Sequence, residues 1–193
     1  MNKTIHYITY QTFPANTANS IQSISNIKYL VRKGVNVKLF FPKREKQSND
    51  DISVLQNHYD FKEEFHAECL EHKLPFGKFK YFNKLSYLYS HLVWSRRAVK
   101  ELLRKYTTPD VFFTRSDWVY YFLSLRNQHV VFECHQLTYL RKLLVNKSIK
   151  KDKSKLICLN QAIADDLMIP ELYASKIKIV PNGYDEDFFE TDY

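Results

Sequence analysis

Three short apolar runs constrain the fold of this chain more than any other feature. They are Val111-Phe112-Phe113, Val130-Val131-Phe132 and the run from Leu156 to Leu159. Near-continuous apolar runs of this kind are typical of central strands in a parallel sheet, which helices cover on both faces. A stretch with helical spacing of its apolar residues follows each run, over 117–125, 137–145 and 161–168. This alternation predicts an α/β domain with a parallel sheet.

The N-terminal part of the chain repeats the same alternation. Residues 4–9 and 35–41 have the composition of strands, and Pro42 closes the second of them. Between these strands, apolar residues recur at three- to four-residue spacing from Ile21 to Val31, which predicts a helix with one apolar face. Such a strand–helix–strand unit is a βαβ crossover, which joins parallel strands.

The middle of the chain is less regular. Residues 43–51 are charged and are predicted to form an exposed loop, whereas 52–80 contain short helical and strand-like pieces. From Phe82 to Tyr106 the apolar residues follow the spacing of a long helix. The opposite face of this helix is basic and carries Arg96, Arg97, Lys100, Arg104 and Lys105.

A last strand is predicted over 177–180. Together these elements predict that residues 1–193 form a single Rossmann-like domain. Its fold class is α/β, a doubly wound and mainly parallel sheet with helices on both faces.

Composition excludes several classes of protein. The chain has 193 residues, of which 45% are hydrophobic and 26% charged, as in globular proteins. It has only 3 glycines and no GxGxxG or GxxxxGKS/T string, so we expect no glycine-rich phosphate loop. The longest apolar-rich run, 118–125, is too short to cross a bilayer, and the N-terminus lacks the apolar core of a secretory signal. Cys69, Cys134 and Cys158 are an odd number without metal-like spacing, which favours free thiols in a reducing cytoplasm.

The formal net charge of +8 indicates an anionic partner: nucleic acid, acidic lipid headgroups or a phosphorylated substrate. The basic residues are spread over several predicted elements, and no nucleic-acid recognition motif occurs. We therefore expect no nucleic-acid partner, although a basic nucleic-acid-binding protein stays an alternative. A second basic run comprises Lys147, Lys150, Lys151, Lys153 and Lys155.

Aromatic residues accompany the basic face of the long helix, namely Tyr87, Tyr89 and Trp94. This combination fits adhesion to an anionic membrane surface, because aromatic rings insert at the interface and basic residues attract acidic headgroups. A solvated basic face is the alternative.

Polar residues stand directly after two of the predicted central strands. Arg115 follows 111–114, and Glu133 and His135 come at the end of 129–133. Side chains just past the carboxyl ends of parallel strands point into the ligand crevice. There a histidine can donate to developing charge, bind a sugar hydroxyl or accept a proton, and the fork of an arginine suits a phosphate or carboxylate. The alternatives are a histidine bonded to a backbone carbonyl and an arginine in solvent.

The loop from Tyr10 to Ser20 lies between the first strand and its helix. Asn16, Asn19 and Ser20 offer hydrogen-bonding side chains there, next to backbone amides of a helix start, which can hold an anion. An N-cap with a surface turn is the alternative.

The sequence gives little support to two other kinds of site. Cys134 and His135 are neighbours on a strand, so their side chains point to opposite faces and do not form a nucleophile–base pair. His58, His66 and His72 lack the i, i+4 spacing of helical zinc ligands. We therefore expect neither a thiol nucleophile nor a metal site.

The most specific string is KIKIVPNGYDEDFF, over 176–189. It ends an apolar run in a Pro-Asn-Gly turn. The string closely resembles the PNG-x-D-x-x-x-F segment that closes the N-terminal domain of family-four glycosyltransferases of the GT-B fold. The loop over 13–20 and the Glu133-x-His135 string are similar to other segments of this family.

This resemblance implies roles for individual residues. His135 would lie at the reaction centre beside the donor sugar, with Glu133 as its support, and Arg115 would face the acceptor. Many members have two glycines where this chain has Pro14-Ala15, so phosphate-binding roles do not transfer to that loop. Asn160 likewise replaces a serine, and its role does not transfer.

The resemblance also implies two groups of substrate-contacting residues. The first lies in the loop that faces the acceptor and comprises Asn16, Asn19 and Ser20. The second shapes the wall of an interdomain cleft and comprises Asn182, Gly183 and Asp185.

The activity implied is transfer of a sugar from a nucleotide-sugar donor to a glycan or lipid-linked acceptor in cell-envelope polysaccharide synthesis. Such enzymes retain the anomeric configuration and generally need no metal or other cofactor, and their C-terminal domain holds most of the donor. Because 1–193 contain no such second domain, we expect the acceptor-side half of an enzyme, a fragment or a separate subunit, inactive alone. We expect it in the cytoplasm, on the inner face of the membrane where it adheres. A non-catalytic sugar- or nucleotide-binding module is the alternative.

Overall fold

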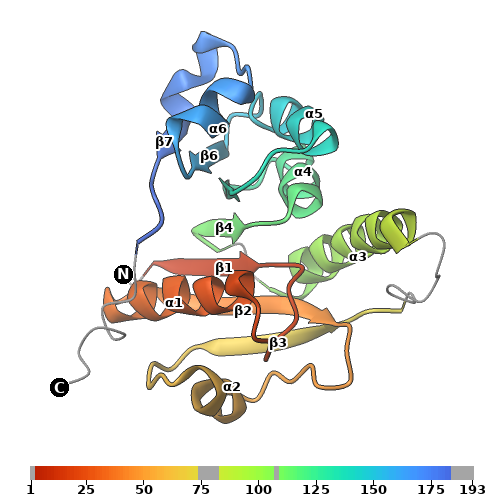
Figure 1. Ribbon diagram of the computed structural model, residues 1–193, viewed down its shortest axis with the longest axis vertical. Helices are drawn as coiled ribbons and strands as arrows, with labels where there is room; N and C mark the ends of the chain where they lie inside the picture. Colours follow the sequence, from red (N-terminus) through yellow and green to blue (C-terminus); the bar gives the residue numbers. More distant parts are fainter. Residues whose placement is uncertain (1–2, 74–82, 107–108, 184–193) are drawn as a thin grey trace.

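A seven-stranded sheet organises the computed structural model, which describes residues 3–73, 83–106 and 109–183. The strand order is β3-β2-β1-β4-β5-β6-β7, and every pair of neighbours is parallel (Figure 1). The strands are β1 (Thr4–Ile8), β2 (Asn36–Lys43), β3 (His66–Glu71), β4 (Val111–Thr114), β5 (Val130–Cys134), β6 (Ser154–Cys158) and β7 (Ile177–Ile179). The predicted doubly wound parallel sheet is confirmed.

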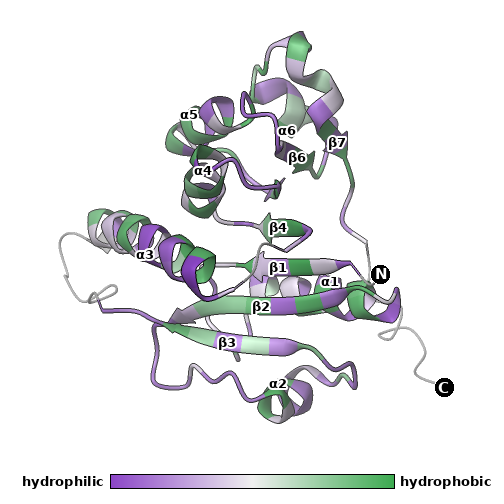
Figure 2. Cartoon of the chain, turned by 180° about the vertical axis from the view of Figure 1, so that it is seen from behind, coloured by the Kyte–Doolittle hydropathy of each residue, from purple (hydrophilic) through white to green (hydrophobic). Residues whose placement is uncertain are grey.

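The two faces of the sheet are covered by different helices: the first two helices of the chain lie on one face, and the later helices lie on the other. On one face lie α1 (Ala18–Arg32) and α2 (Ile52–Tyr59). On the other lie α3 (Asn83–Lys105), α4 (Asp117–Leu125), α5 (Tyr139–Ser148) and α6 (Gln161–Asp166), and a 3-10 helix, η1 (Glu171–Lys176), precedes β7. Figure 1 shows α1 in front of β1 and β2, and Figure 2, which shows the molecule from behind, has α3 in front and α1 behind.

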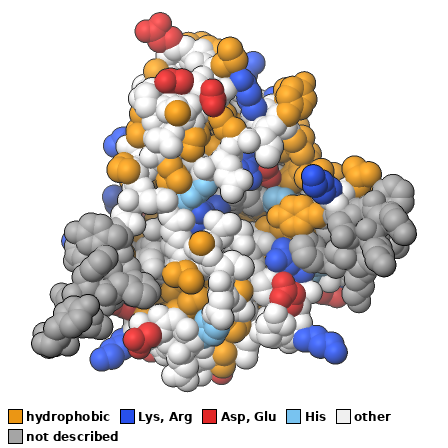
Figure 3. Space-filling model, viewed as in Figure 1, with side chains coloured by type: hydrophobic (Ala, Val, Ile, Leu, Met, Phe, Trp, Pro, Cys, Tyr) orange, Lys and Arg blue, Asp and Glu red, His pale blue; other side chains and the backbone are white. Residues whose placement is uncertain are grey.

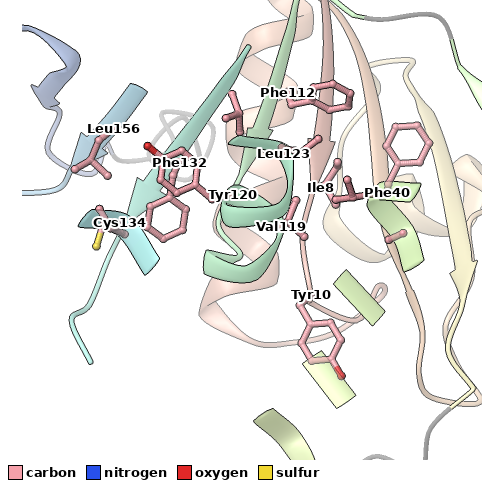
Figure 4. Close-up of a cluster of buried hydrophobic side chains, with 14 of the residues drawn as sticks. Ile8, Tyr10, Phe40, Phe112, Val119, Tyr120, Leu123, Phe132, Cys134 and Leu156 are labelled. Atoms are coloured by element: carbon pink, nitrogen blue, oxygen red, sulfur yellow. The ribbon is translucent and has the colours of Figure 1, made fainter. Parts of the chain in front are cut away.

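Alternating side chains of the strands divide the core into two clusters, because successive residues of a strand point to opposite faces. Tyr7 and Phe113 pack under α1 and α2, whereas Ile8 and Phe112 pack under α3 and α4. Figure 4 shows part of the α3–α4 cluster, in which the rings of Tyr120 and Phe132 stack 5.1 Å apart between α4 and β5. The central strands are therefore buried on both faces, as their apolar runs predict.

Local sequence fixes where the helices begin. Their N-caps are Thr17 for α1, Asp51 for α2, Ser116 for α4, Thr138 for α5 and Asn160 for α6, and each side chain accepts a hydrogen bond from a backbone amide of the first turn. These residues satisfy amides that have no partner within the helix. Beyond α1, Gly34 has a φ of 78°, the left-handed conformation expected after a helix.

The structure resolves the irregular middle of the chain and corrects the predicted end of the second strand. The segment without a clear period forms α2 and the edge strand β3, so the sheet gains a strand. In addition, β2 continues through Pro42 to Lys43. Its pairing with β1 ends at Phe40, and beyond that point only β3 pairs with it, where the missing amide of Pro42 is tolerated.

The long helix α3 shows its predicted basic face, since Arg96, Arg97 and Lys100 are exposed. Trp94, which was expected beside them at a membrane surface, is instead 3% exposed within the core. Leu85, on the predicted apolar face, is 64% exposed because the first turns of α3 extend past the core. No helix in the described parts of the chain has both the length and the apolar character needed to span a bilayer.

Candidate active site

A polar pocket of about 210 Å³ lies at the carboxyl edge of the sheet. Its walls come from the loops after β1, β4 and β5 and from α1, α3 and α5. The lining residues are Gln11, Asn19, Tyr87, Arg115, Glu133, His135, Gln136 and Arg141. This is the edge at which open α/β sheets bind their ligands.

Glu133, His135 and Arg115 form a charged cluster in this pocket. His135 Nε2 lies 2.9 Å from Glu133 Oε1, and Arg115 Nη2 lies 2.8 Å from His135 Nδ1. Arg115 Nε lies 3.7 Å from Glu133 Oε2. The side chains of Glu133 and Arg115 are only 9% and 7% exposed, so these charges interact with little solvent between them.

Helix α1 holds Arg115 from the other side. Its guanidinium donates to the backbone oxygen of Asn19 at 3.2 Å, to Ser23 Oγ at 3.3 Å and to Gln22 Oε1 at 3.0 Å. A guanidinium with this many fixed acceptors has a defined orientation. Arg115 thereby connects the tips of β4 and β5 to the first turns of α1.

A second arginine, Arg141 at the start of α5, completes the pocket wall. Its Nε lies 3.3 Å from Asp117 Oδ2, and its Nη1 donates to the backbone oxygen of Gln136 at 2.6 Å. The pocket thus has two arginines, each balanced by a carboxylate, which gives it polar character without a large excess of charge.

Behind this wall, a Ser–His–Asp group resembles the triad of a hydrolase in composition only. His91 Nε2 lies 2.7 Å from Ser116 Oγ, and its Nδ1 lies 3.9 Å from Asp117 Oδ1. Ser116 is 2% exposed, and its Oγ accepts the amide of Val119 as the N-cap of α4. A substrate has no access to this hydroxyl, so the group supports the fold and does not supply a nucleophile.

A second pocket of about 340 Å³ adjoins the first on the α1 face of the sheet. Tyr7, Phe113 and Ile157 provide apolar walls, and Val180 to Gly183 close one side. Glu133 lines both pockets.

The model of glycosyltransferase family 4 matches residues 25–188, most of the chain. The chain belongs to glycosyltransferase family 4. No curated protein matches it. Among solved structures it is similar to one described as the N-terminal domain of trehalose-6-phosphate phosphatase from Candida albicans. The TM-score is 0.66 at 10% sequence identity, and the match covers 100% of this chain and 51% of that one. At this identity the likeness shows the fold alone, and the chain spans about half the length of that structure.

Four of the residues predicted for a glycosyltransferase site meet in the polar pocket: Asn19, Arg115, Glu133 and His135. Asn182 and Gly183 line the adjoining pocket, and Gln22 of α1 donates a hydrogen bond to the side chain of Asn182. The strand tips and the Pro-Asn-Gly turn therefore lie together and not at opposite ends of the sheet.

Two predicted ligand contacts are not supported in this family 4 domain. Ser20 is fully buried, and its hydroxyl donates to the backbone oxygen of Thr12 at 3.2 Å and contacts Thr17 Oγ1, so it serves the start of α1. Asn16 is exposed and lines neither pocket described above. The predicted Asp185 lies outside the described residues.

Sequence reasoning missed five residues near the site, and they are Gln11, Gln22, Tyr87, Gln136 and Arg141. A signal existed for Gln22, because it lies three positions after Asn19 and so shares its helix face. Tyr87 carried no such signal, because α3 reaches the pocket only through the tertiary fold.

Cys134 is fully buried, and burial raises the pKa of its thiol to about 11. Its side chain packs in the α3–α4 cluster, whereas His135 faces the pocket. The expected separation of these two neighbours is confirmed. In 3–73, 83–106 and 109–183, no three His, Cys, Asp or Glu side chains are grouped as metal ligands.

Proposed function

We propose that this domain is the acceptor side of a retaining glycosyltransferase. It would place a hydroxyl of a glycan or lipid-linked acceptor in the polar pocket while a nucleotide sugar is bound opposite. The Glu133–His135–Arg115 cluster at the carboxyl edge of a family 4 domain carries this proposal. We further propose that the reaction belongs to cell-envelope polysaccharide synthesis in the cytoplasm.

The chemistry follows from the groups that line the pocket. Sugar transfer develops positive charge at the anomeric carbon and negative charge on the departing diphosphate. His135 contacts a sugar hydroxyl, and Arg115, which lies 2.8 Å from its Nδ1, holds the ring in place. Arg115 and Arg141 orient polar groups of the acceptor by donating hydrogen bonds.

The pocket lies at the carboxyl edge of the sheet, and we propose that a second domain covers it and holds most of the donor. In that arrangement residues 1–193 act as one domain, with the Asn182–Gly183 turn at the boundary. The isolated chain is then expected to transfer no sugar.

Membrane adhesion is part of the proposal, on a surface that differs from the one expected. Exposed apolar side chains stand near the pocket on the first turns of α3 and at the start of α5, namely Leu85, Leu88, Tyr89, Tyr139 and Leu143. Figure 3 shows orange side chains along the right-hand rim of this face. An apolar rim beside the basic face of α3 suits a membrane that carries a lipid-linked acceptor.

The test is a transfer assay with a matched pair of histidine variants. The chain is assayed alone and together with the polypeptide encoded directly downstream, using a panel of labelled nucleotide sugars and an extract of envelope lipids. We expect transfer only with both polypeptides, and His135→Ala should lower its rate about 100-fold or more. His129→Ala, an exposed histidine at the other end of β5, is the control and should retain the wild-type rate.

Robust transfer by the isolated chain would contradict the need for a second domain. Equal rates for the two histidine variants would contradict the role of the pocket.

A further inference from the structure

The contact between Arg115 and His135 determines which ring nitrogen carries the proton. Arg115 Nη2 lies 2.8 Å from His135 Nδ1. A guanidinium has only donors, so Nδ1 must accept this hydrogen bond. The remaining ring proton therefore lies on Nε2.

This assignment makes Nε2 of His135 a hydrogen-bond donor. Nε2 lies 2.9 Å from Glu133 Oε1, but the direction of this contact is not that of a hydrogen bond, and no described residue accepts one from it. Nε2 is buried, so this N–H lies within the wall of the polar pocket that His135 and Glu133 line. With its proton on Nε2, this nitrogen can give a hydrogen bond and cannot remove a proton.

Gln22 in turn determines the position of Arg115. Its Oε1 accepts from Arg115 Nη2 at 3.0 Å, the same nitrogen that donates to His135. Its Nε2 donates to Oδ1 of Asn182. The side-chain amide of Gln22 thus forms hydrogen bonds with both Arg115, which contacts His135, and Asn182 in the turn after β7.

We infer that Gln22 and Arg115 are positioning residues: Gln22, anchored on Asn182, holds Arg115, which keeps the proton of His135 on Nε2. Only the effect on sugar transfer rests on the proposed function. The location of the proton does not.

The decisive measurement is long-range ¹H–¹⁵N NMR of His135 in the labelled 193-residue chain, assigned with His135→Gln. In the wild type we expect Nδ1 of His135 to be bare and Nε2 to carry the proton. In Arg115→Met, Nδ1 loses its donor and the proton is no longer held on Nε2, so we expect Nδ1 to carry it in part of the molecules. The other charged or titratable groups around this pocket are Arg141 and Tyr87.

The glutamine variants separate positioning from a general loss of structure. Gln22→Leu should shift Nδ1 part of the way toward the protonated form. Gln22→Glu keeps an acceptor for Arg115 but has no donor for Asn182, so it should shift Nδ1 less than Gln22→Leu does. Gln11→Leu, on the rim of the same pocket, is the matched control and should leave Nδ1 bare. If Arg115→Met does not fold, as thermal unfolding would reveal, the Gln22 pair still decides.

A protonated Nδ1 in the wild type, or an unchanged Nδ1 in both Arg115→Met and Gln22→Leu, would overturn the inference. In the transfer assay we expect Gln22→Leu to lose activity on the order of 10-fold to 100-fold, with partial rescue by Gln22→Glu. Full activity of Gln22→Leu would also overturn it. A confirmed proton position without any measurable transfer counts against the proposed function alone.

Discussion

The residues around the site differ most in the solvent exposure of their side chains. Glu133 and Arg115 are nearly buried, yet each has a charged partner, which offsets the loss of hydration. His91, one layer deeper, has neutral Ser116 at 2.7 Å and the carboxylate of Asp117 at 3.9 Å. Burial lowers the pKa of His91 to about 4, although Asp117 acts in the opposite direction.

This burial predicts how stability depends on pH. Between about pH 6.5 and about pH 4 the unfolded chain binds a proton at His91 and the folded chain does not, so the free energy of unfolding falls as pH falls through this range. We expect His91→Gln, which keeps a hydrogen bond for Ser116, to remove about 2 kcal/mol of the difference between pH 7 and pH 5. Urea unfolding at the two pH values measures this, and an unchanged difference would contradict it.

At the scale of elements, α1 carries the largest part of the site. Its first two turns supply Asn19, Gln22 and Ser23 to Arg115, so the start of the helix fixes where the arginine lies. Thr17 determines that start, because its Oγ1 accepts the amide of Ser20 at 3.2 Å. An error of one residue at the cap would turn all three contacts away from Arg115.

The N-cap predicts a measurable loss of stability. We expect Thr17→Ala to lower the free energy of unfolding by about 1 kcal/mol, because the amide of Ser20 loses its side-chain acceptor. Thr17→Ser keeps the hydroxyl and should stay close to the wild type. Chemical denaturation of the three proteins measures both effects, and equal stabilities of Thr17→Ala and Thr17→Ser would show that the cap is unimportant.

On the scale of the whole molecule, the apolar rim and the polar pocket share two helices, α3 and α5. Leu85 and Leu88 on α3 and Tyr139 on α5 are exposed, while Tyr87 and Arg141 from the same two helices line the pocket. A membrane in contact with the rim would therefore lie next to the proposed acceptor site.

This arrangement predicts binding to acidic vesicles. We expect the chain to sediment with vesicles containing phosphatidylserine, and less with phosphatidylcholine alone, because the basic face of α3 adds electrostatic attraction. Leu85→Glu with Leu88→Glu should abolish sedimentation, since two charges replace apolar contacts. Leu125→Glu, at the far end of α4, is the matched control. Absence of binding to either vesicle at low salt would contradict membrane adhesion.

The sequence by itself determined the alternation of strands and helices and the residues at the strand tips. The apolar runs of β4, β5 and β6 are typical of buried parallel strands. Arg115, Glu133 and His135 are predicted site residues because they lie at the carboxyl ends of β4 and β5. Both features are local, because they depend on side-chain period and on the end of a strand. The segment that forms α2 and β3 lacked a clear period, since an edge strand is only half-buried and needs no continuous apolar run.

Only the tertiary structure decided which polar groups meet. Gln22 and Asn182 are separated by 160 positions, and nothing in either neighbourhood indicates their hydrogen bond. The same holds for Ser20, whose hydroxyl turns inward to Thr12, and for Trp94, which lies in the core although Arg96 and Arg97 follow it closely in the sequence. The periodicity and composition of a segment indicate which of its residues face the interior. The hydrogen-bond partners of a side chain on distant elements depend instead on strand order and helix packing, which no single segment contains.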